Sequence, residues 1–166
     1  MRRFILLLPL FTLLFIGSAR AQLGNEDSTY DLRVKAILDD IGYKYDITDN
    51  GDFKIVIALD SDRTQAVYVK SATEFYDEME VREIWSFGYS CTGPLPADVA
   101  NKLLQNSFDQ KIGAWQVASN DSVSIAIFAI KMSANADETS VKSAIIAAVR
   151  NADAVEMDLT GKDDEF

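Results

Sequence analysis

The chain has 166 residues, a net charge of −10 and no histidine. Because histidine is the usual general base and a common metal ligand, its absence excludes Ser-His-Asp and Cys-His catalytic systems and zinc sites built on histidine. The excess of acidic side chains disfavours nucleic acids and anionic membranes as partners, since both carry negative charge.

The first 21 residues have the order of a secretory signal peptide. Arg2 and Arg3 precede an apolar run at residues 4–16, and the small residues Ala19 and Ala21 frame a cleavage site. The apolar run is shorter than the roughly 20 residues needed to span a bilayer, so we expect no stable membrane anchor. The sequence therefore predicts cleavage after Ala21 and a periplasmic or secreted protein, which begins with a flexible segment at residues 22–28.

Apolar residues recur at helical spacing from residue 30 to residue 41 and predict the first helix. Ser28 and Asp31 are spaced like a capping box at its start, and Gly42 is the residue type that commonly ends a helix. A helix followed by a glycine stop is therefore expected at the beginning of the folded part.

Alternating apolar and polar residues at 43–47 and 53–59 predict two strands. The dipeptide Asn50-Gly51 between them is a strong signal for a hairpin turn. A third strand is expected at residues 64–71.

The acidic stretch at residues 73–80 predicts a loop or a short helical turn, followed by a fourth strand at residues 81–90. Successive side chains of a strand point to opposite faces, so Trp85, Phe87 and Tyr89 are predicted to form one aromatic row. This row is either a binding surface or part of the core under a helix.

A second helix is expected after Pro96, and two strands follow at residues 114–118 and 122–132. Asp137 and Glu138 suit the start of a last helix, where acidic side chains interact favourably with the helix dipole. The second helix is predicted to present one face made of Ala100, Leu103, Leu104, Ser107 and Phe108.

These elements predict an α+β fold with an antiparallel six-stranded sheet and three helices in the order α-ββββ-α-ββ-α. A single domain is expected at residues 29–159, with an acidic tail at 160–166. The strand at 122–132 is apolar on both faces, so we expect both faces to be covered there by a helix, a second copy of the chain or a ligand.

The order of elements resembles the YbjN-like family, whose domains share the fold of small type III secretion chaperones. The resemblance covers residues 30–158, and three short motifs carry it: Gly42-Tyr43-Lys44-Tyr45-Asp46, Leu103-Leu104-Gln105-Asn106 and Gly113-Ala114-Trp115-Gln116-Val117. It implies a non-enzymatic interaction domain, often dimeric, without a catalytic set. The export signal departs from the type III chaperones, which act in the cytosol.

Two groups of polar residues have some features of a functional site. Asp60 and Asp62 have the spacing of a carboxylate pair, but they also fit a solvated turn. The stretch from Asp46 is similar to the start of a calcium loop, but its twelfth position is Ile57, where a chelating glutamate is required. We therefore predict no catalytic, cofactor or metal site, and the single cysteine, Cys91, has no internal disulfide partner.

The leading hypothesis is an exported, chaperone-like domain that binds a protein or peptide, as a monomer or a homodimer, through Trp85, Phe87 and Tyr89. The alternative is a periplasmic protein that binds a small apolar ligand between the sheet and the helices.

Overall fold

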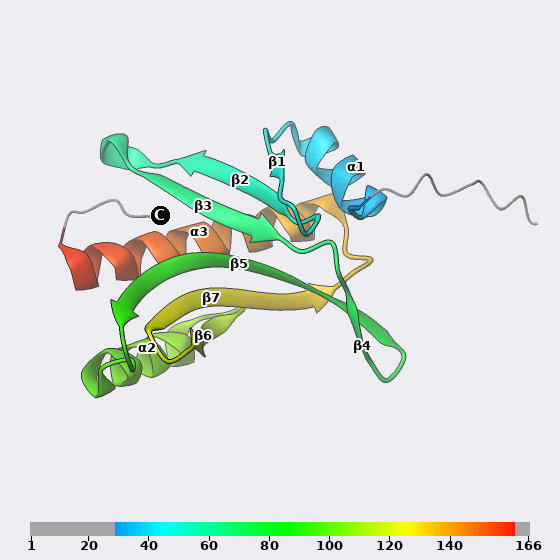
Figure 1. Ribbon diagram of the computed structural model, residues 1–166. Coiled ribbons are helices and arrows are strands. Elements are labelled where there is room, and N and C mark those ends of the chain that lie inside the picture. The colour runs from blue at the N-terminus through cyan, green and yellow to red at the C-terminus, as the bar shows by residue number, and fades with distance from the viewer. Residues whose placement is uncertain (1–28, 162–166) are drawn as a thin grey trace, which may run out of the picture.

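The structure is a computed structural model that describes residues 29–161 (Figure 1). The predicted signal peptide, the segment at residues 22–28 and residues 162–166 of the tail lie outside the described residues. Helix α1, Leu32–Ile41, begins at Asp31, whose carboxylate accepts a hydrogen bond from the Arg33 N–H. It ends at Gly42, which has φ 81° in the left-handed region that favours glycine. The expected helix and its glycine stop are confirmed.

The predicted first hairpin is also confirmed. Strand β1, Asp46–Ile47, pairs antiparallel with β2, Phe53–Ala58, and the connecting loop contains Gly51 at φ 84°. A short 3-10 helix, Asp60–Asp62, then leads into β3, Thr64–Val69, which pairs with β2 along its length. The second and third strands therefore lie where the alternation places them.

The acidic stretch at residues 73–80 is a hairpin rather than a loop or helical turn. Strand β4, Glu74–Tyr76, turns at Asp77 and Glu78 into β5, Met79–Thr92. This hairpin extends beyond the rest of the sheet (Figure 1). Its turn lacks glycine and asparagine, which are the usual signals, and Asp77 itself adopts φ 55°.

The second half of the chain contains α2, Ala97–Asp109, β6, Ala114–Ser119, β7, Val123–Ser133, and α3, Glu138–Thr160. The predicted shared face of α2 is wrong in one respect. Leu103 is buried, whereas Leu104 and Phe108 are exposed, Phe108 by 90%. Among the described helices, none is both long and apolar enough to cross a bilayer.

The strands form one sheet in the order β1-β2-β3-β5-β7-β6, with β4 paired to β5 beside β3. Every strand pair within residues 29–161 is antiparallel, which confirms the α+β fold with three helices. The described sheet has seven strands rather than six, because β4 was not expected.

The three helices pack on one face of the sheet, which we call the helix face. Buried side chains of α1, α2 and α3 join a single core with the inward side chains of the strands, including Phe53, Val67, Ile84 and Phe128. We call the opposite face of the sheet the open face, because no described helix packs on it. We expected both faces of β7 to be covered. Within the described residues, helices cover one face of β7 and leave the other face open.

Candidate binding surface

An aromatic cluster occupies the middle of the open face. Tyr68 on β3 lies directly opposite Trp85 on β5, and their rings stack with centroids 4.3 Å apart. Phe87, two residues further along β5, contacts Trp85 edge-on at 4.8 Å and Tyr68 at 5.8 Å. All three side chains are half-buried. The cluster thus combines a fixed geometry with surface that remains accessible.

The structure brings Trp85 and Phe87 together and places Tyr89 elsewhere. The pairing of β5 with β7 shifts register between Phe87 and Tyr89, so that Tyr89 lies opposite Ala126, a residue of the core. The extra residue, Gly88, forms a β-bulge, which turns the following side chain to the other face. Tyr89 therefore packs against the core, and Tyr68, which sequence reasoning missed, takes the third place in the cluster.

Small residues flank the cluster on the neighbouring strands. Ala129 lies opposite Trp85 on β7, Ala66 precedes Tyr68 by two positions on β3, and both are buried beside the larger rings. Val56 on β2 lies opposite Ala66 and is 54% exposed. The open face therefore offers an apolar area across the central strands.

Charged side chains border this area toward the β4–β5 hairpin. The carboxylate of Glu83 lies 4.0 Å from the Lys70 ammonium and 3.8 Å from the Lys131 ammonium. Such partly exposed pairs contribute little to stability, but they set the polarity of the border. They separate the aromatic cluster from a second apolar region on the hairpin.

That second region is a hollow of about 570 Å³ between the hairpin and the end of β7. Tyr76 and Met79 lie opposite each other at the hairpin tip and are 78% and 53% exposed. By the alternation of β5, they share the open face with Trp85. The hollow is lined by Glu74, Phe75, Tyr76, Met79, Val81, Lys131, Met132 and Ser133.

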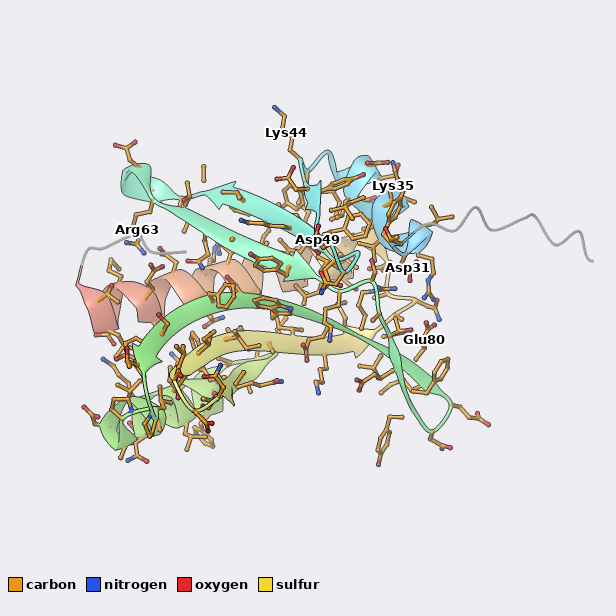
Figure 2. The ribbon with its side chains drawn as sticks, in the orientation of Figure 1. Asp31, Lys35, Lys44, Asp49, Arg63 and Glu80 are labelled. Carbon is orange, nitrogen blue, oxygen red and sulfur yellow. The ribbon has the colours of Figure 1, made fainter. Side chains whose placement is uncertain are left out.

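The base of the hairpin is attached to α1 by two arginines. Arg33 donates two hydrogen bonds to the Glu80 carboxylate, at 2.7 and 2.8 Å, and also pairs with Asp31. Arg82 is almost fully buried and donates to Asp31 and to the carbonyls of Lys70 and Ser71. Figure 2 shows Asp31 and Glu80 at this end of the molecule.

These contacts lower the pKa values of both carboxyl groups. Burial alone would raise the pKa of Asp31, but hydrogen bonds from Arg33 and Arg82 outweigh it and hold that pKa well below its usual range. Hydrogen bonds from Arg33 and Thr73 lower the pKa of Glu80 to about 2. The network stays ionised above these values and fixes the orientation of the hairpin.

The carboxylates that the sequence offered as candidate sites lie apart from the aromatic cluster and from the hairpin hollow. Asp60 and Asp62 are exposed on the short 3-10 helix at the opposite end of the sheet, near the labelled Arg63 (Figure 2). The Thr48 hydroxyl, the Asn50 side chain and Asp52 bond to one another within the first hairpin loop. Within residues 29–161, no group of three His, Cys, Asp or Glu side chains is arranged to hold a metal ion.

A separate hollow of about 440 Å³ lies between β2 and α3. Ile57 and Ala58 line it from the sheet, Val149 and Arg150 line it from the helix, and Asp60 lies at its edge. Its position between sheet and helix is the one expected for a small-ligand pocket.

No family model matches the sequence, and no curated protein matches it at a significant level. The fold is similar to the crystal structure of YbjN from E. coli, which is described as a candidate transcription regulator. The two share 10% sequence identity with a TM-score of 0.50, over 76% of this chain and 89% of that chain. At this identity the likeness shows a common fold and does not transfer a function.

Proposed function

We propose that this chain is a non-enzymatic binding domain that takes an apolar segment of a partner protein on its open face. The observation that carries the proposal is the packed cluster of Tyr68, Trp85 and Phe87 on the face without described helices. Tyrosine and tryptophan are the residue types that dominate binding energy at protein interfaces, because they bury a large area at a small loss of conformational freedom.

The rigidity of the cluster supports this function. Tyr68 and Trp85 are already stacked on neighbouring strands, so ordering them on binding costs little conformational entropy. The acidic surface favours a protein partner over DNA or an anionic membrane, since the net charge is −10. A regulatory role like that described for YbjN would therefore act here through contacts with protein.

The test uses neutral fluorescent 12-residue peptides that contain zero, two or four leucine or phenylalanine residues. Anisotropy titrations should show affinity that rises with the number of apolar residues. Trp85→Ser should lower the affinity for the tightest-binding peptide at least tenfold. Phe108→Ser, which removes an exposed aromatic side chain from α2, should leave this affinity unchanged. Absence of binding at millimolar protein, or equal loss in both variants, would refute the proposal.

A second copy of this chain is the other occupant to test on this face. Size-exclusion chromatography with light scattering measures the mass directly. A dimer that dissociates in Trp85→Ser but not in Phe108→Ser would assign the open face to self-association in place of peptide capture.

The hollow between β2 and α3 favours a second candidate function, the binding of a small apolar ligand. Its volume suits a compact molecule, and Ile57 and Val149 supply apolar walls. Native mass spectrometry of freshly purified protein should then show an additional mass that is lost in Ile146→Trp, because Ile146 is a partly buried lining residue of the hollow and a larger side chain there reduces the space. Protein that always carries its sequence mass alone would count against this candidate.

We also propose that the chain is exported and cleaved after Ala21, on the strength of the leader-like order of its first residues. Intact-mass measurement of the protein recovered from the periplasm or medium should give an N-terminus at Gln22. A full-length chain confined to the cell interior would contradict export.

A further inference from the structure

We infer that the hollow on the β4–β5 hairpin is a docking site for a basic, amphipathic protein segment. The apolar side chains of such a segment would occupy the hollow beside Tyr76 and Met79, and its lysines or arginines would face the carboxylates of the hairpin. The inference rests on the proposed function, because the hollow belongs to the same open face as the aromatic cluster.

Large apolar side chains are exposed together on the hairpin. Phe75, Tyr76 and Met79 are each more than half exposed, although a short hairpin needs none of them to be apolar. Together with Val81 and Met132 they line one hollow. The flexible side chain of Met79 adapts to varied apolar partners, which suits the capture of a segment rather than a single small molecule.

Carboxylates around the hollow favour a cationic occupant. Glu74 lines the hollow, and Asp77 and Glu78 form the turn at its outer end. Among the described residues, none of these three carboxylates forms an ion pair, whereas Glu80 at the base is held by Arg33. The one ammonium that lines the hollow, Lys131, lies 3.8 Å from Glu83. The hairpin therefore presents uncompensated negative charge around an apolar hollow, which is complementary to a cationic amphipathic segment.

The arrangement also fits a segment of ordinary length. Phe87 follows Met79 by eight positions along β5, which corresponds to about 26 Å at about 3.3 Å per residue. An amphipathic helix of roughly 17 residues covers the same distance. One partner segment can thus contact the hollow with one end and the aromatic cluster with the other.

The test uses a 14-residue peptide of leucine and lysine in helical amphipathic order, and the same peptide with glutamate in place of lysine. Protein labelled with 13C at methionine methyl groups reports the site, because Met79 and Met132 line the hollow while Met157 is exposed on α3. The lysine peptide should shift the Met79 and Met132 signals and leave Met157 unchanged. The glutamate peptide should bind at least tenfold more weakly.

Two variants separate charge from apolar contact. The combined change Glu74→Gln, Asp77→Asn and Glu78→Gln should raise the Kd of the lysine peptide at least fivefold. It should also reduce the dependence of this Kd on salt. Tyr76→Ser combined with Met79→Ser should raise the Kd of the lysine peptide at least tenfold, and Phe108→Ser should leave this Kd unchanged. All of these side chains are exposed, so the variants should fold, which the Met157 signal verifies.

The inference is overturned if the two peptides bind equally, if Met157 shifts as much as Met79, or if no binding occurs at millimolar peptide. Stronger binding to vesicles that contain phosphatidylserine than to the lysine peptide would also overturn it, because the hollow would then take lipid. The proposed function of the open face is tested independently. Trp85→Ser should lower the affinity for the neutral apolar peptides, whether or not the hairpin variants change the affinity for the lysine peptide.

Discussion

The indole of Trp115 lies over Gly88, so that a Cβ atom at Gly88 would be 2.3 Å from Cη2 of the indole. Trp115 belongs to β6 and Gly88 to β5, and the indole crosses the intervening β7 to reach it. The ring is held by a hydrogen bond of 2.7 Å from its Nε1 to Asn106 on α2. The absence of a side chain at residue 88 therefore makes room for a buried tryptophan.

Gly88→Ala should destabilise the protein by about 1–3 kcal/mol, because the added methyl group overpacks a site whose neighbour is a fixed ring. Urea unfolding measures the change. In a Trp115→Phe background, where the clashing ring atoms are absent, the same substitution should cost less than half as much. An equal cost in both backgrounds would show that the glycine serves the backbone and not the indole.

Acid should weaken the attachment of the hairpin to α1. The pKa values of Asp31 and Glu80 are lowered in the folded state, so both groups contribute stability that is present above their ordinary pKa values, 3.8 and 4.5, and is lost as pH falls through the folded values. The urea midpoint should therefore drop between about pH 4.5 and pH 2.

Asp31→Asn isolates this effect, since asparagine also caps a helix but carries no charge. The variant should lose about 1–2 kcal/mol at pH 6, because the buried Arg82 loses its carboxylate partner, and should show a shallower decline with acid than the parent chain. A decline of identical slope would place the acid sensitivity outside this network.

Removing Arg63 should be costly at neutral pH. Its guanidinium lies 2.7 Å from the Asp153 carboxylate and 3.2 Å from that of Glu156, which is fully buried in α3. Arg63→Gln should destabilise by about 3 kcal/mol, and Arg63→Gln with Glu156→Gln by less, because the second change removes the buried charge. Chemical denaturation of the single and double variants provides the comparison, and additive losses would contradict the argument.

Two glycines of the same backbone conformation should respond differently to alanine. Gly42 has φ 81° and open space around it, so Gly42→Ala should cost about 1 kcal/mol from backbone strain alone. At Gly51, with φ 84°, a Cβ atom would also lie 1.8 Å from the Thr29 carbonyl oxygen. Gly51→Ala should therefore cost at least about 2 kcal/mol, as measured by thermal or urea unfolding.

The sequence predicts most of the fold because its signals are local. The alternation around Asn50 and Gly51, the glycine stop at Gly42 and the acidic helix start at Asp137 each depend on a few neighbouring residues, and all are found in the structure. The cap of the first helix differs from the prediction: the structure has Asp31 as the cap, whereas the capping-box spacing predicts Asp31 three residues after a cap at Ser28. Strand β4 was missed because its turn, Asp77–Glu78, has glutamate in place of the glycine that usually follows asparagine or aspartate in a hairpin turn. Its apolar side chains are also exposed, so burial gives no alternating pattern there.

The candidate site was predictable only in part. Trp85 and Phe87 share a face because of strand geometry, which the sequence shows. Tyr68 depends on the register between β3 and β5, which only the assembled sheet reveals. Tyr89 was assigned to the wrong face because the row was extended through Gly88, although a glycine within a strand is itself a sign of a bulge.

Because every described helix lies on the same side of the sheet, neighbouring positions of β5 should tolerate substitution differently. Residues 82, 84 and 86 keep the chain folded, whereas 81, 83, 85 and 87 meet the surroundings. Substitutions at the outward positions should change the chemistry of the exposed surface while the architecture persists. Every second residue of this strand is therefore open to redesign without repacking the interior.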